Sequence, residues 1–125
     1  MTTVLLVDDE PDLLAIFGML LELSGYEVQT AADGEEAMHR MAERRPDILI
    51  TDWMMPRMGG EELCRELRRP GSPHADVPII VASAVKQPRR DASPPLYDRF
   101  VRKPTSVDDV IRLIEEMEAE RGARR

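Results

Sequence analysis

Apolar residues occur along this chain in two alternating patterns, short continuous runs and longer stretches with a helical period. A continuous run such as Val4–Val7 is typical of a strand that is covered on both faces of its sheet. From Asp12 to Ser24, by contrast, apolar residues recur every three or four positions, which predicts a helix. Gly25 then suits the left-handed conformation in which many helices end. The first quarter of the chain therefore predicts a strand followed by a helix.

The same alternation continues to the C-terminal region. Further strands are expected at Glu27–Ala31, Ile48–Thr51, Val77–Ala82 and Arg99–Arg102, and further helices from Asp33 to about Arg45, from Glu61 to Arg69 and from Ser106 onward. Pro46 ends the second helix, and the Ser106 hydroxyl is a suitable cap for the last one. Strands that alternate with helices indicate an α/β domain with a parallel sheet, helices on both faces and right-handed crossovers.

Composition and charge narrow the range of functions. The 125 residues have the size of one domain, residues 1–125, and contain 42% apolar and 33% charged residues. The formal net charge of −7 argues against a general nucleic-acid or anionic-membrane binder. Cys64, the single cysteine, excludes an internal disulfide, and no apolar run is long enough to span a bilayer. The N-terminus lacks the positive region of a signal peptide, so a cytoplasmic location is expected.

Residues with reactive side chains follow four of the five expected strands. Asp8 and Asp9 follow the first strand, Asp52 the third, Ser83 the fourth and Lys103 the fifth. In parallel α/β sheets, binding sites form at the carboxyl ends of the strands. We therefore expect three carboxylates, a hydroxyl and an ammonium group to gather at one edge of the sheet.

This set of groups suits a metal-assisted reaction of a phosphoryl group. Three neighbouring carboxylates repel one another, and a hard divalent cation removes that conflict. Oxygen-only ligands favour Mg²⁺ over Zn²⁺, and no cluster of His or Cys suggests a softer metal. Ser83 and Lys103 can donate hydrogen bonds to an anion beside the metal. Asp is moreover a known covalent nucleophile towards phosphoryl groups.

The motifs that carry these residues resemble those of the receiver domain of bacterial two-component response regulators, with the chemotaxis regulators as the nearest type. The matching segments are LLVDDEPD at 5–12, DILITDWMMPRMGG at 47–60, PIIVASA at 78–84 and FVRKP at 100–104. They occur in the order and at the separations found in that family, and the resemblance covers nearly the whole chain. It implies a flavodoxin-like three-layer sandwich with five helices and a five-stranded parallel sheet in the order 2-1-3-4-5.

The resemblance also implies a role for each site residue. Asp52 is implied to be the phosphoacceptor, with Asp8, Asp9, Asp52 and the backbone carbonyl of Met54 around Mg²⁺, which Mn²⁺ can replace. Ser83 and Lys103 are implied to bind the phosphoryl oxygens, and the peptide bond before Pro104 to be cis. Ser83 and Phe100 correspond to the switch residues, although Phe100 could instead be a fixed aromatic side chain.

The implied function is a phosphorylation-activated signalling switch and not an enzyme. The phosphoryl donor would be the phosphohistidine of a sensor histidine kinase or of a phosphotransfer protein, and residues Leu13–Leu21 are the expected docking region. A receiver of this type is either a monomer or a phosphorylation-dependent dimer. It contacts no nucleic acid or membrane directly, and it can stand alone or form part of a longer protein.

Two features depart from the family pattern. Between Val85 and Asp98, where the family has its fourth helix, the sequence contains Pro88, Pro94 and Pro95. Because proline in a helix interior costs about 3 kcal/mol, we expect this helix to be short or distorted. Two positions that influence acyl-phosphate hydrolysis in the family, Met54 and Val85, are apolar here, which predicts a long-lived phosphorylated state.

Two other functional classes fit part of the pattern. A Mg²⁺-dependent phosphatase of the haloacid dehalogenase type also has an Asp nucleophile at a strand end, but it requires a second Asp two residues later, where this chain has Met54. A receiver-like scaffold that is never phosphorylated would not need the full set of Asp8, Asp9, Asp52, Ser83 and Lys103. P-loop NTPases are excluded because the GxxxxGK[ST] motif is missing.

Overall fold

The computed structural model describes residues 1–84, 95–103 and 105–123. Its strands are β1 (Thr3–Val7), β2 (Glu27–Ala31), β3 (Ile48–Thr51), β4 (Ile79–Ser83) and β5 (Arg99–Arg102). Its helices are α1 (Pro11–Leu23), α2 (Gly34–Glu43), α3 (Gly60–Arg68) and α4 (Val107–Ala123). None of the helices within these residues has the length and apolar character needed to cross a lipid bilayer.

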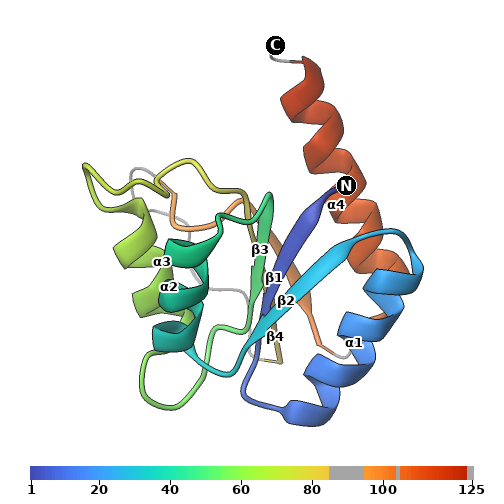
Figure 1. The fold of residues 1–125 in the computed structure, drawn as a ribbon, viewed down its shortest axis with the longest axis horizontal. Helices are drawn as coiled ribbons and strands as arrows, with labels where there is room; N and C mark the ends of the chain where they lie inside the picture. Colours follow the sequence, from blue (N-terminus) through green and yellow to red (C-terminus); the bar gives the residue numbers. More distant parts are fainter. Residues whose placement is uncertain (85–94, 104, 124–125) are drawn as a thin grey trace.

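All five strands form one parallel sheet in the order β2-β1-β3-β4-β5, which confirms the expected topology. The sheet is the middle layer of three: α2 and α3 cover one face, and α1 and α4 cover the other (Figure 1). The strand order changes direction beside β1, between β1 and β3. In doubly wound sheets of this kind, a site is expected at this point, at the carboxyl ends of the strands.

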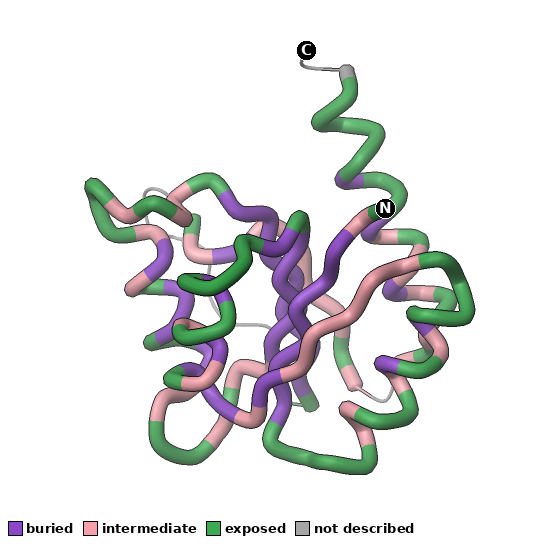
Figure 2. Tube along the Cα trace, viewed as in Figure 1, coloured by how far each residue is buried: buried purple, intermediate pink, exposed green. Residues whose placement is uncertain are grey.

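Successive residues of each buried strand pack into two separate cores, one on each face of the sheet. Leu5, Val7, Leu49, Ile79 and Val81 face α2 and α3. Their neighbours along the strands face α1 and α4, namely Val4, Leu6, Ile48, Ile50, Ile80 and Ala82. The strands in the centre of the sheet are therefore buried on both sides, as Figure 2 shows, and this explains their continuous apolar sequence.

The observed bounds differ from the expected ones at two places with clear physical causes. β4 begins at Ile79 and not at Val77, because Pro78 has no N–H to donate to the sheet; its carbonyl accepts a hydrogen bond from the Leu49 N–H at 2.9 Å. α1 begins at Pro11, one residue before the expected start, where a proline is well suited to the first turn of a helix.

The number of helices in the described residues can be compared with the five that were expected. The described residues contain four, and the last of them, α4, is the helix expected to start after Ser106. The short or distorted fourth helix was expected within 85–98, of which residues 85–94 lie outside the described residues and 95–98 are not helical. Val85 and Pro104 also lie outside the described residues. That part of the sequence-based expectation stays a prediction.

Candidate functional site

The register of the central strands places Asp8 and Asp52 side by side. Val7 of β1 is paired with Thr51 of β3, so the residue that follows each strand emerges at the same height on the sheet edge. The Asp52 N–H donates a hydrogen bond to the Val7 carbonyl at 3.0 Å, which fixes this alignment. Two carboxylates that are far apart in the sequence therefore become neighbours.

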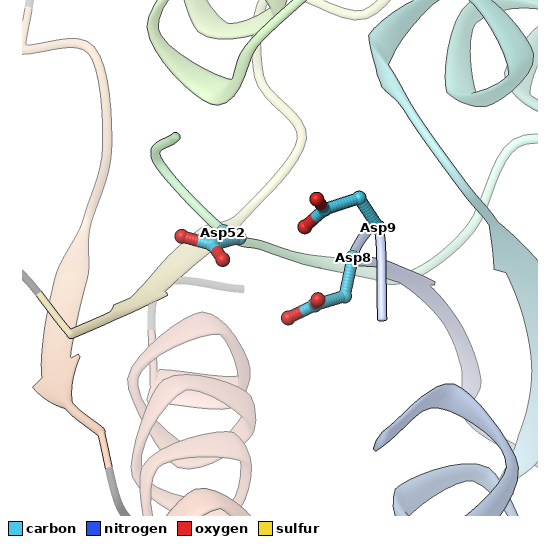
Figure 3. Close-up of side chains that lie close together, drawn as sticks. All are labelled: Asp8, Asp9 and Asp52. Carbon is cyan, nitrogen blue, oxygen red and sulfur yellow. The ribbon is translucent and has the colours of Figure 1, made fainter. Parts of the chain in front are cut away.

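Asp9 completes a cluster of three carboxylates. One side-chain oxygen from each of Asp8, Asp9 and Asp52 lies within 4.8 Å of the other two, and Figure 3 shows the three side chains together at the strand ends. Asp8 is buried, Asp52 is half-buried and Asp9 is exposed. The cluster is thus reachable from solvent, although two of its three members are anchored inside the protein.

Lys103 is the cation of this cluster. Its backbone N–H donates to the Ser83 carbonyl at 2.8 Å, which attaches it to the carboxyl end of β4. Its ammonium group contacts the Asp8 carboxylate and lies 3.2 Å from Oδ2 of Asp52. Burial alone would lower the pKa of Lys103, but the hydrogen bonds and negative charges of Asp8 and Asp52 outweigh this and raise the pKa above its ordinary value. Lys103 is therefore protonated at neutral pH.

Backbone groups hold the two anchored carboxylates in place. The Glu10 N–H donates to Oδ1 of Asp8 at 2.9 Å, and the Met54 N–H donates to Oδ1 of Asp52 at 3.2 Å. Each carboxylate thus uses one oxygen for the backbone and the other for Lys103. This arrangement fixes the direction in which both side chains point before any ligand arrives.

The loop between β3 and α3 closes tightly behind Asp52. The Gly60 N–H donates to the Trp53 carbonyl at 2.9 Å. A Cβ atom on Gly60 would lie 2.0 Å from the Asp52 carbonyl oxygen and 2.8 Å from the Cα of Trp53, so only glycine fits here. Gly60 therefore allows α3 to start directly against the backbone of Asp52, the candidate phosphoacceptor.

The oxygen atoms of this cluster fit a hard divalent cation. All three candidate side-chain ligands are carboxylates, and Asp9 faces solvent, which leaves room for water ligands of the kind that Mg²⁺ retains. A cleft of about 420 Å³ opens onto Asp8, Asp52 and Lys103, and most of the other side chains along its wall are apolar and come from the sheet, α1 and α4. A phosphoryl donor can therefore approach Asp52.

The remaining predicted site residues lie around this cluster in different environments. Ser83 is the buried last residue of β4, next to Lys103 through the backbone contact described above. Phe100 lies on β5, half-buried, and packs on the core beneath α2 and α3. Met54 is an exposed residue of the loop after β3. The structure therefore brings Asp8, Asp9, Asp52 and Lys103 into one cluster and places Ser83 beside it.

Sequence reasoning missed two features near the site. Tyr97, which lies in the segment expected to be irregular, is almost fully buried and makes an edge contact with Trp53, with ring centroids 5.9 Å apart. The signal that could have identified it is a large aromatic residue placed just before the expected strand Arg99–Arg102. The ion pair between Arg57 and Asp33 was also missed, and no spacing in the sequence indicates it.

Comparisons with known proteins agree with the fold and identify the family. The model of the response regulator receiver domain family matches residues 4–115. The phosphate regulon transcriptional regulatory protein PhoB of Rhizobium meliloti is 37% identical over 112 residues, which cover 89% of this chain and 49% of that protein. The alkaline phosphatase synthesis transcriptional regulatory protein PhoP of Bacillus subtilis is 42% identical over 66 residues, 53% of this chain and 28% of that protein. The chain thus spans less than half the length of these relatives.

Solved structures of receivers superpose closely on the chain. Chemotaxis protein CheY4 of Vibrio cholerae has a TM-score of 0.83 at 28% identity, covering 93% of this chain and 98% of that one. Response regulator TrrA of Thermotoga maritima, solved in complex with Mg²⁺ and BeF, has a TM-score of 0.81 at 32% identity with the same coverage. The chain belongs to the response regulator receiver domain family. Receivers of this family are the phosphorylation-activated switches of two-component systems.

Proposed function

We propose that Asp52 is the phosphoacceptor of this receiver and that residues 1–125 form one receiver domain. The observation that carries the proposal is the position of the Lys103 ammonium group, in contact with Asp8 and 3.2 Å from Asp52. A phosphoryl group on Asp52 would bring further negative charge to a cluster that already holds three carboxylates. Lys103 is the fixed cation that can receive it.

The reaction is a transfer between two side chains. An Asp52 carboxylate oxygen forms a bond to phosphorus while the P–N bond of the donor phosphohistidine breaks, and the bonding electron pair returns to the imidazole ring. The products are an acyl phosphate on Asp52 and a neutral histidine. Lys103 and the Ser83 hydroxyl bind the phosphoryl oxygens, so their roles are to orient the group and stabilise its charge. The donor is a sensor histidine kinase or a phosphotransfer protein.

Mg²⁺ is the proposed metal. Asp8, Asp9, Asp52 and the backbone carbonyl of Met54 would hold it, and Mn²⁺ would be able to replace it because it accepts the same oxygen ligands. When bound, the metal neutralises charge on the transferring phosphoryl oxygens. The three carboxylates that converge within 4.8 Å support this assignment.

The signal is proposed to pass through Ser83 and Phe100. A phosphoryl group carries about −1.5 to −2 charges and draws the Ser83 hydroxyl towards Asp52. Phe100 then changes its packing, which shifts the population between two conformations of the output face. The ring contact between Phe100 and Tyr97, at 6.5 Å between centroids, supports such a coupling because Tyr97 also contacts Trp53, next to Asp52. If Phe100 is instead fixed, its replacement by leucine will leave the response to phosphorylation unchanged.

The remaining assignments follow from the same proposal. The protein acts in the cytoplasm as a non-enzymatic switch, as a monomer or as a dimer that forms on phosphorylation. Its kinase docks on α1, and the receiver itself contacts neither nucleic acid nor membrane. Met54 and Val85 cannot orient an attacking water, so the acyl phosphate is expected to last longer than in fast chemotaxis receivers; a half-life of seconds in the purified protein would contradict this.

The decisive experiment is the intact mass of the protein after incubation with acetyl phosphate and Mg²⁺. We expect a gain of one phosphoryl group that requires Mg²⁺ and disappears in Asp52→Ala. Asp12→Ala is the matched control, because Asp12 lies in the first turn of α1 and outside the acidic cluster. Absence of the gain in the folded wild type would favour the scaffold alternative, whereas turnover of a phosphomonoester would favour the phosphatase.

A further inference from the structure

Asp33 is a buried carboxylate that takes no part in the acidic cluster. Its Oδ1 accepts a hydrogen bond from the Glu36 N–H at 2.9 Å and so caps the N-terminus of α2. Its Oδ2 accepts from Nε of Arg57 at 2.8 Å and also from the terminal nitrogen of that guanidinium. The two oxygens of one side chain thus connect α2 to the loop between β3 and α3.

A backbone contact reinforces this connection. The Gly34 N–H donates to the Met58 carbonyl at 2.8 Å. A Cβ atom on Gly34 would lie 2.7 Å from Cγ of Met58 and 2.9 Å from its carbonyl oxygen, so the start of α2 is packed directly on the loop. Met58 directly follows Arg57, so this hydrogen bond and the Asp33–Arg57 ion pair hold the same part of the loop.

Arg57 has a backbone conformation that needs such support. Its φ is +62°, in the left-handed region that non-glycine residues rarely adopt. Conformations of this kind persist where surrounding contacts determine them, and they are frequent near functional sites. The ion pair with Asp33 is the side-chain contact that offsets this strain, because the Arg57 side chain is otherwise largely exposed.

The same loop is held at its other end beside the acidic cluster. The Trp53 carbonyl accepts from the Gly60 N–H, and the Met54 N–H donates to Asp52 at 3.2 Å. Met54 therefore lies between two fixed points, the cluster at the base of the loop and Asp33 at the Arg57 end. The peptide group after Met54 therefore lies in a stretch of backbone that is held on both sides.

We propose that Asp33 and Arg57 form a positioning pair that holds the β3–α3 loop in the conformation in which the Met54 carbonyl binds the metal. The inference rests on the proposed function, in which that carbonyl is a ligand. Neither Asp33 nor Arg57 touches the metal; they act through the loop backbone. Outer groups that orient ligands in this way typically change metal affinity by about 10- to 100-fold when they are removed.

For the substitution Arg57→Ala, a purely electrostatic role of Arg57 and a role in positioning the loop predict opposite changes in the affinity for Mg²⁺. Arg57→Ala removes a positive charge near an acidic site, which by electrostatics alone would strengthen Mg²⁺ binding. If the guanidinium instead positions the loop, the same substitution weakens binding. Alanine keeps the Cβ atom, so the backbone strain at φ +62° is retained while the ion pair is lost. The sign of the change therefore separates the two explanations.

The test is a titration of the isotope-labelled protein with MgCl₂, followed by the NMR shifts of backbone amides. We expect Arg57→Ala to raise the Kd for Mg²⁺ about tenfold, at the low end of the range for outer groups, and Arg57→Lys to have a smaller effect. Arg40→Ala is the matched control: Arg40 forms an exposed ion pair with Glu36 within α2, and its removal gives the same change in charge. Its Kd should equal that of the wild type.

The outcomes separate this inference from the proposed function. An unchanged or tighter Kd in folded Arg57→Ala, with normal wild-type binding, would overturn the positioning role alone. A wild type that does not bind Mg²⁺ would overturn the metal assignment and the positioning role with it.

Asp33→Asn is a second variant, because asparagine can still cap α2 but offers Arg57 no charge; we expect a higher Kd for Mg²⁺ here too. Arg57→Gly removes the ion pair and also relieves the backbone strain at this position. If weaker Mg²⁺ binding in Arg57→Ala comes from loss of the ion pair and not from strain, Arg57→Gly should bind Mg²⁺ more weakly as well.

Discussion

Lys103 Nζ lies 3.2 Å from Oδ2 of Asp52, although 51 residues separate the two in the sequence. The same ammonium group contacts Asp8, so one cation compensates two anchored carboxylates at the carboxyl edge of the sheet. The side chains of all three residues are largely shielded from solvent. Among the described residues, the cation that balances the charge of the site therefore comes from the position directly after the edge strand.

Lys103→Met should destabilise the protein when Mg²⁺ is absent. The substitution leaves three neighbouring carboxylates without a cation, and we expect a loss of about 2 kcal/mol, less than for a fully buried pair because Asp9 is exposed. Mg²⁺ should restore much of this stability but not the rate of phosphorylation. Urea unfolding in EDTA and in MgCl₂ measures the loss of stability and its recovery. The rate at which acetyl phosphate adds a phosphoryl group, followed by intact mass, measures phosphorylation. Arg102→Met, an exposed neighbour with the same change in charge, is the control; equal losses in the two variants would contradict the argument.

Gly60→Ala should be far more damaging than Gly59→Ala. A Cβ atom at 60 would lie 2.0 Å from the Asp52 carbonyl oxygen, whereas one at 59 would come no closer than 3.4 Å to the Trp53 carbonyl oxygen. Both neighbours are backbone, so at 60 the loop itself must move. We expect a loss of about 3 kcal/mol or more for Gly60→Ala and less than about 1 kcal/mol for Gly59→Ala. Urea unfolding measures the difference, and similar values for the two variants would refute the close-approach explanation.

Arg68 is a buried arginine that joins α3 to the segments before β4 and β5. Its guanidinium donates to the carbonyls of Ala75 at 2.9 Å and Val77 at 2.7 Å, and it forms an ion pair with Asp98 at 3.0 Å. Arg68→Ala removes this donor from the Ala75 and Val77 carbonyls, whereas Asp98 still accepts from the Ile79 N–H at 2.8 Å. We expect a loss of about 2–3 kcal/mol in free energy of unfolding. Arg69, its neighbour, forms only an exposed pair with Glu66.

Arg69→Ala is therefore the control for this prediction, with an expected change within about 0.5 kcal/mol. Both free energies come from thermal or urea unfolding followed by circular dichroism. A small effect of Arg68→Ala would mean that water replaces the guanidinium at these carbonyls.

Cys64 should make the stability of the wild type fall at high pH. Burial raises the pKa of its thiol from 9.0 to about 12 in the folded protein. Above pH 9 the thiol ionises in the unfolded chain but not in the folded one, so the unfolded state is favoured as pH rises. The free energy of unfolding should therefore drop by about 1.4 kcal/mol at pH 10 relative to neutral pH, from this group alone.

Comparison with Cys64→Ala isolates this effect from other titrating groups. The alanine variant should be less stable at pH 7, because a small cavity replaces the buried sulfur, and the difference between the two proteins should shrink from pH 9 to pH 10. Urea unfolding at each pH measures it. A difference that stays constant would show that the thiol ionises equally in both states.

The sequence predicted the sheet well because its central strands are buried on both faces. Val4–Val7 and Ile48–Thr51 read as continuous apolar runs, and a residue with a functional side chain follows each of them. The acidic cluster was predictable for the same reason: in a parallel sheet, strand ends meet at one edge. The comparisons confirm the family and with it the class of function.

Contacts between loops and helices could not be predicted in this way. Arg57 and Arg68 look like ordinary surface cations in the sequence, since nothing in their spacing indicates that Asp33 or Asp98 will lie opposite them. Such pairs depend on how two connections that are distant in sequence approach each other, which no periodic pattern encodes. Tyr97 was missed because the prolines around it suggested an irregular segment and concealed a core residue.

The place of β5 at the edge of the sheet has a consequence for synthesis. Within the described sheet, β5 pairs only with β4, and the lysine that compensates Asp8 and Asp52 directly follows it. On the ribosome, all three carboxylates emerge long before Lys103 does, because Asp8, Asp9 and Asp52 precede it in the sequence. A nascent chain therefore reaches its final charge balance only when the last strand is added.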